Sequence, residues 1–112
     1  METQPVNGQI TIAPEVLETI ARLTTLAVPG VARLAPPPGI RHMLRHDGVG
    51  IEVVNRRVLV TLHVITESNV QMLDLGRKIQ SEVTRAIRDM VGMEVASVEV
   101  HIEDVAYTSD KT

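Results

Sequence analysis

The stretch "VGIEVVNRRVLVTLHV", residues 49–64, decides the fold class. On both sides of the polar break "NRR", hydrophobic side chains recur at every second position. Successive side chains of a β-strand point to opposite faces of a sheet, so this alternation is typical of two strands. The segment therefore predicts a β-hairpin with one strongly aliphatic face.

The residues before the hairpin predict an amphipathic helix. Pro14 suits the first position of a helix, because its missing N–H would have no partner there. Hydrophobic residues follow at helical spacing, and Pro29 and Gly30 end the pattern. The predicted apolar stripe consists of Val16, Leu17, Ile20, Leu23 and Ala27.

The residues after the hairpin predict a second, longer helix. Ser68 followed by Gln71 fits a capping box, in which each side chain satisfies a backbone donor left free at the helix start. Gly92 supplies a left-handed stop. The predicted apolar stripe consists of Met72, Leu75, Ile79, Val83, Ala86 and Met90.

Two further alternating segments predict strands, "GQITI" at residues 8–12 and "VASVEVHIEDV" at residues 95–105. The predicted order is β-α-β-β-α-β, an α+β fold. Its simplest packing is a two-layer sandwich with both helices on one face of a four-stranded sheet, and we expect a ferredoxin-like strand order. A single domain should cover residues 8–107, between a flexible leader (1–7) and a flexible tail (108–112).

Composition narrows the function classes. The 112 residues include no Phe or Trp, so the core must be aliphatic, and the absence of cysteine excludes disulfides and thiolate metal sites. A net charge of -3 opposes a main role in neutralising phosphates, so we expect no nucleic-acid partner. No apolar run approaches the roughly 20 residues of a membrane span, and no signal-peptide pattern is present, so a cytoplasmic location is expected.

The stretch "RHMLRHDG", residues 41–48, raises the question of a metal site. On a helix, His42 and His46 would lie on one face about a turn apart, as paired zinc ligands do. Zinc needs three or four protein ligands, however; Asp47 is the only other local candidate, and further ligands would have to come from the distant His63 or His101. We therefore favour the alternative, a short basic helix with solvent-exposed histidines, and expect no metal or other cofactor.

Two more histidines, His63 and His101, fall on the outward-facing positions of the predicted strands and are expected to be solvated; Ser97, Glu99 and Glu103 also point outward on the last strand. Nucleophilic catalysis would need a base beside Ser or Thr together with an orienting group, and the sequence contains no such local cluster. The protein is therefore predicted not to be an enzyme.

The same outward face suggests an interaction surface. It carries Val54, Leu59 and Ile65, more apolar area than a lone module needs for solubility, so these residues are interface candidates. Arg56 and Arg57 at the hairpin tip could meet an acidic partner, a lipid headgroup or RNA. The lack of aromatic stacking residues speaks against RNA.

The order of motifs resembles a known family. The segments "GQITIAPEVLETIA", "VPGVARL", "GVGIEVV", "VLVTLHV" and "NVQMLDLGRKIQSEVTRAIRDMVGMEVASVEVHIEDV" are similar to the alkaline shock protein and Gls-type general-stress family of bacteria, over about residues 8–105. The most specific part is "MVGMEV" followed by "ASVEVHIEDV". The sequence departs from the family at residues 66–68, where members usually carry a tyrosine-glycine pair.

This resemblance implies a small non-enzymatic cytoplasmic protein of envelope or general stress homeostasis. It would act as an adaptor or scaffold that binds itself or an envelope-associated partner, and so reach the membrane only indirectly. Some relatives are tied to regulation of fatty-acid synthesis, and that alternative stays open. So do a small metal-dependent enzyme built on the histidines and an RNA-binding module.

Overall fold

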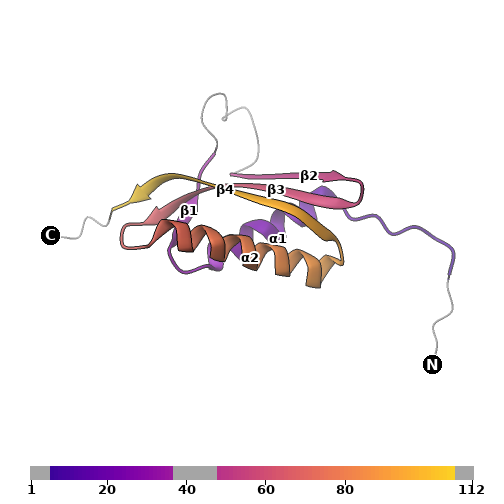
Figure 1. Ribbon diagram of the computed structural model, residues 1–112. Helices are drawn as coiled ribbons and strands as arrows, with labels where there is room; N and C mark the ends of the chain where they lie inside the picture. The colour runs from indigo at the N-terminus through magenta and orange to yellow at the C-terminus, as the bar shows by residue number, and fades with distance from the viewer. Residues whose placement is uncertain (1–5, 37–47, 108–112) are drawn as a thin grey trace.

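Within residues 6–36 and 48–107, which the computed structural model describes, two helices pack against one four-stranded sheet (Figure 1). The predicted α+β class, with both helices on one face of the sheet, is confirmed. The elements in chain order are α1 (Pro14–Ala27), β1 (Val31–Leu34), β2 (Val49–Val54), β3 (Arg57–Glu67), α2 (Met72–Val91) and β4 (Glu94–Ala106).

The predicted hairpin is formed by β2 and β3. Val54 pairs with Arg57, so the turn consists of Asn55 and Arg56, whose φ angles are 52° and 66°. Positive φ at both central residues is what a type I′ turn requires, and the twist of this turn matches that of the flanking strands. The buried positions of β3 alternate as predicted and are Val58, Val60, Leu62, Val64 and Thr66.

Strand β3 lies at the centre of the sheet. Along one edge it pairs with β2 through residues 57–62 and with β1 through residues 64–66, both antiparallel. The backbone of His63 joins the two pairings: its N–H donates to the Gly48 carbonyl at 2.8 Å, and its carbonyl accepts from the Ala35 N–H at 2.9 Å. β1 and β2 therefore lie end to end, like two halves of one interrupted strand.

Gly48 makes this junction possible. Its φ is +86°, and a Cβ atom there would lie 2.4 Å from the Ala35 carbonyl oxygen and 2.8 Å from the His63 carbonyl oxygen. Both contacts are with backbone, which cannot rotate away as a flexible side chain can. Only glycine combines this conformation with this close approach.

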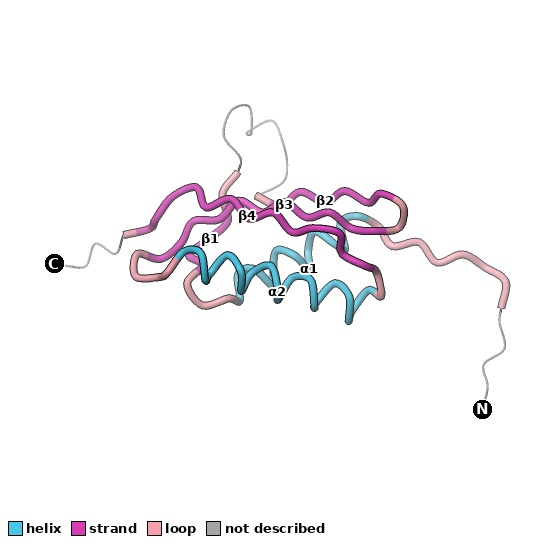
Figure 2. The backbone as a smooth tube through the Cα atoms, viewed as in Figure 1, coloured by secondary structure: helices cyan, strands magenta, loops and turns pink. Residues whose placement is uncertain are grey.

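The opposite edge of β3 pairs with β4 in parallel over nearly its whole length. Parallel neighbours need a long crossover connection, and α2 supplies it by running back across the sheet (Figure 2). The expected ferredoxin-like strand order is wrong, because that order would separate β3 from the last strand. Here the last strand lies directly beside β3.

The prediction that residues 8–12 form the first strand is wrong. Residues 8–12 form no strand, and Ile10 is 91% exposed. Both edges of β3 are already occupied, by β4 on one side and by β1 and β2 on the other, so the central strand has no edge left for this segment. The sheet instead gains β1, which begins directly after Gly30.

Both helices cover the same face of the sheet and contact each other (Figures 1 and 2). The core-facing residues of α2 are Leu75, Ile79, Val83 and Ile87, so the predicted stripe is confirmed in its middle, whereas Met72 and Met90 are exposed. The core-facing residues of α1 are Leu17, Ile20, Ala21 and Thr25. The predicted stripe of α1 was wrong at Val16, Leu23 and Ala27, which are exposed because the helix is rotated toward Ala21 and Thr25.

Of the two predicted ends of α2, the capping box at Ser68 and Gln71 is wrong. Ser68 lies outside the helix, and the N-cap is Gln71, whose side-chain oxygen accepts from the Asp74 N–H at 2.9 Å. The predicted stop at Gly92 is confirmed: its φ is 80°, and its N–H donates to the Arg88 carbonyl. After Met93 the chain enters β4, which pairs with β3.

Candidate functional site

The face of the sheet opposite the helices is covered by no element of the described chain (Figures 1 and 2). We call it the open sheet face. Its residues largely alternate with the buried ones along each strand, and they are Gly50, Glu52 and Val54 of β2, Leu59, Thr61, His63 and Ile65 of β3, Ser97, Glu99, His101, Glu103 and Asp104 of β4, and Arg33 of β1.

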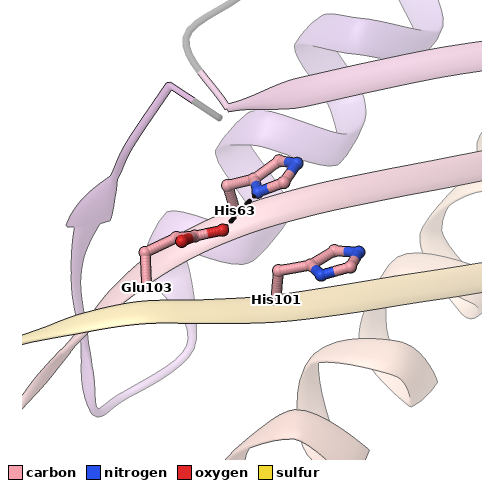
Figure 3. A group of neighbouring side chains, drawn as sticks. All are labelled: His63, His101 and Glu103. Carbon is pink, nitrogen blue, oxygen red and sulfur yellow. Dashed lines mark hydrogen bonds and ion pairs between the residues drawn. The ribbon is translucent and has the colours of Figure 1, made fainter. Parts of the chain in front are cut away.

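Two histidines lie side by side on the open sheet face. His63 and His101 are direct partners in the parallel ladder between β3 and β4. Their rings are stacked, with centroids 4.7 Å apart and planes 13° apart (Figure 3). Directly opposite side chains on one sheet face are close enough to interact, so the register alone brings these imidazoles together.

Glu103 completes the group from β4. Its Oε2 lies 2.6 Å from His63 Nδ1, and dashes mark this contact in Figure 3. Val64 pairs with Ile102 and Ile65 with Asp104, so the register shift leaves Glu103 without a ladder partner. A β-bulge of this kind redirects a side chain. Here the bulge lies where the Glu103 carboxylate approaches the His63 imidazole on the neighbouring strand.

The three side chains differ in exposure. The side chain of His63 is 15% exposed and that of Glu103 27%, whereas that of His101 is 48% exposed. His101 Nε2 lies 3.4 Å from Glu99 Oε1, so each imidazole has a carboxylate neighbour. The group is therefore half-sheltered, open to solvent on the side of His101, and acidic in its surroundings.

Two imidazoles and one carboxylate are a ligand set that could hold a metal ion. One ligand atom from each of His63, His101 and Glu103 lies within 4.8 Å of the others, and among the described residues this is the one such group of three. The sequence placed all three on outward positions of strands but did not bring them together. Only the parallel register of β3 with β4 shows that they meet.

The other predicted site residues differ in their exposure, and not all of them fall within the described part of the chain. His42 and His46 lie outside the described residues. Val54 is 46% exposed at the end of β2, while Leu59 and Ile65 lie half-buried on the open sheet face. The arginines of the hairpin, at residues 56 and 57, are exposed, and Arg57 Nε lies 3.7 Å from Glu94 Oε1.

Near Leu59 the open sheet face has a shallow depression of about 310 Å³. Residues from β2, β3 and β4 line it, among them Glu52, Leu59, Thr61 and Ser97. Its open shape and its mixture of small, apolar and acidic lining residues suit an inserted side chain better than an enclosed small molecule.

Comparison with known proteins places the chain among envelope-related proteins. Residues 2–107 match the model of the alkaline shock protein family, described as having a cell envelope-related function. No curated protein matches the sequence significantly. None of the described helices is both long enough and apolar enough to cross a membrane.

Solved structures share the fold at low sequence identity. A MamM-CTD structure is 13% identical with a TM-score of 0.54, covering 82% of this chain and 99% of that chain. A second MamM CTD variant is 14% identical with the same TM-score, covering 81% and 96%. A third, described as a manganese form, is 12% identical with a TM-score of 0.53, covering 82% and 99%. These likenesses concern the fold alone.

Proposed function

The chain belongs to the alkaline shock protein family, and on that premise we propose that it is a non-enzymatic adaptor or scaffold in cell-envelope homeostasis that acts by self-association. The observation that carries the proposal is the open sheet face. A two-layer fold normally leaves such a face polar, whereas this one presents Leu59 and Ile65, half-buried, on its central strand. A second copy of the chain is the occupant that we propose for this face.

Charge distribution supports a second copy. Arg33 of β1 and Asp104 of β4 both pair with Ile65, so opposite charges flank the central strand in the same row. If two sheets stack about a two-fold axis along β3, β1 of one copy lies over β4 of the other. Arg33 of each copy then faces Asp104 of its partner, with Ile65 between them.

The proposed surface is testable by light scattering over a range of protein concentrations. The parent should form a dimer, and Leu59→Glu or Ile65→Glu should weaken dimerisation at least about tenfold, because each buries a charge in the interface. Leu23→Glu is the matched control, since Leu23 is 59% exposed on α1, in the other layer. A parent that is monomeric at every concentration contradicts self-association.

A charge swap sharpens the test. Arg33→Asp should weaken the dimer by placing two like charges opposite each other, and adding Asp104→Arg should restore it. If the double variant dimerises no better than either single variant, the two residues do not face each other and the stacked arrangement is wrong. Recovery of an envelope protein with the parent but not with Leu59→Glu would assign the same face to a different partner.

A further inference from the structure

We propose that His63, His101 and Glu103 form a binding site for one divalent transition-metal ion, and that zinc is the ion that fits this ligand set best. The three residues come from two adjacent strands of the open sheet face (Figure 3). Their ligand atoms already lie within 4.8 Å of one another. The site departs from the sequence-based expectation of no metal, and it does not rest on the proposed self-association.

The geometry needs only a small adjustment to close around an ion. Zinc binds imidazole nitrogen and carboxylate oxygen at about 2.0–2.2 Å, which separates tetrahedral ligand atoms by about 3.3–3.5 Å. The present upper separation of 4.8 Å exceeds this by about 1.3–1.5 Å. Rotation of the exposed His101 ring and the Glu103 carboxylate about their side-chain bonds can supply that difference without moving the strands.

The least mobile member of the group is His63. Its backbone N–H and carbonyl are both hydrogen-bonded at the junction of β1 and β2, and its ring lies between the neighbouring strands with only 15% of the side chain exposed. A ligand held in this way loses little conformational entropy when it binds an ion. His63 thus fixes the position of the site, and the other two residues close on it.

The surroundings favour a cation. The carboxylates of Glu99 and Glu103 contact the two imidazoles, at 3.4 Å and 2.6 Å. Carboxylates beside metal-binding histidines orient the rings and raise their basicity. If Glu103 binds the ion itself, Glu99 is left as the carboxylate that orients His101.

The ligand types select the class of ion. Imidazole favours zinc, nickel, cobalt and copper, whereas magnesium and calcium prefer sites built from oxygen ligands. Two histidines and one carboxylate also leave at least one coordination position of zinc open to water or to a group from elsewhere. The simplest alternative is an ordinary hydrogen-bonded His–Glu pair on a sheet surface, which would show no preference for transition metals.

The test is titration of the full chain, freed of metal with a chelator, with zinc, cobalt and magnesium salts. Calorimetry should give one zinc per chain, the cobalt complex should absorb visible light, and magnesium should give no signal. His63→Ala, His101→Ala and Glu103→Gln should each weaken zinc binding by at least about tenfold. Histidine ring signals in NMR spectra should shift for His63 and His101 when zinc is added.

Three controls decide whether the signal belongs to this site. Glu52→Gln lies on the same face outside the group and should leave affinity unchanged. The double variant His42→Ala with His46→Ala should also bind normally. Because His101 is exposed, His101→Ala should keep the fold, and zinc should raise the melting temperature of the parent but not of this variant.

Any of three results would overturn the proposal. The parent protein binds no stoichiometric zinc, magnesium gives the same response as zinc, or zinc affinity is unchanged in His63→Ala and His101→Ala. Loss of binding in the double variant at residues 42 and 46 alone would assign the metal to the connector instead. The Leu59→Glu variant, which should not dimerise, should still bind zinc. The test of zinc binding can therefore succeed or fail independently of the proposed self-association.

Discussion

Three glycines offer a direct test of how tightly the junction at His63 is built, because the same change to alanine has a different physical meaning at each. Gly76, inside α2, has no atom within 4 Å of an added Cβ. Gly92, after α2, has a φ of +80° and equally open surroundings. Gly48 combines a φ of +86° with backbone oxygens at 2.4 and 2.8 Å. The series thus separates helix propensity, backbone strain and steric overlap.

The expected changes in the free energy of unfolding differ in sign and size. Gly76→Ala should stabilise the protein by about 0.5–1 kcal/mol, because alanine loses less backbone entropy in a helix. Gly92→Ala should destabilise it by about 1–2 kcal/mol, the cost of a left-handed non-glycine residue. Gly48→Ala carries that same cost and must also displace backbone, which adds about 1–3 kcal/mol. Its total should therefore be about 2–5 kcal/mol.

Urea denaturation followed by far-UV circular dichroism measures all three variants against the parent, with a shared slope confirming that the two-state analysis applies. The decisive comparison is between Gly48→Ala and Gly92→Ala. If the two cost the same, the carbonyls of Ala35 and His63 do not press on residue 48. The end-to-end arrangement of β1 and β2 would then be wrong.

Other predictions concern the core. Ile79 is fully buried on α2, so Ile79→Ala should destabilise the protein by about 2–5 kcal/mol in a denaturant titration. Lys78 lies on the exposed side of the helix, so Lys78→Ala should cost less than about 0.5 kcal/mol. Equal effects of the two changes would mean that the buried face of the helix is misassigned. The Thr66 hydroxyl is buried and has no hydrogen-bond partner among the described residues, so Thr66→Val should raise the melting temperature by removing an unsatisfied polar group worth about 1–3 kcal/mol. A lower melting temperature would indicate that the hydroxyl is satisfied, for instance by a water molecule.

Patterns carried by neighbouring residues predicted much of this architecture. The hairpin follows from alternation in residues 49–64, and α2 follows from apolar spacing that ends at Gly92. The failure at residues 8–12 has the opposite cause. A short alternation shows that a segment can be a strand, but pairing with a sheet makes it one, and residues 8–12 pair with no strand, while both edges of β3 are occupied by β1, β2 and β4. β1 was missed because four residues carry too little periodicity.

The candidate site was only half predictable for the same reason. Alternation placed His63, His101 and Glu103 on outward positions, since the face of each side chain depends only on the strand it belongs to. Their meeting depends on pairing between strands about 40 residues apart in sequence. Had β4 paired elsewhere, as in the expected strand order, the same outward positions would have been far apart.

The sequence by itself determined the class of the fold, the turn at Asn55 and the inward or outward direction of most strand residues. These features depend only on periodicity and turn chemistry within contiguous segments. The tertiary structure alone decided that β4 lies parallel to β3, that β1 and β2 meet at the backbone of His63, and that two imidazoles and a carboxylate converge. The physical reason is that strand partner and register are set by competition for hydrogen-bonding edges and by packing against the helices. A shift of two residues between β3 and β4 would keep every side chain on its face of the sheet and separate the two histidines.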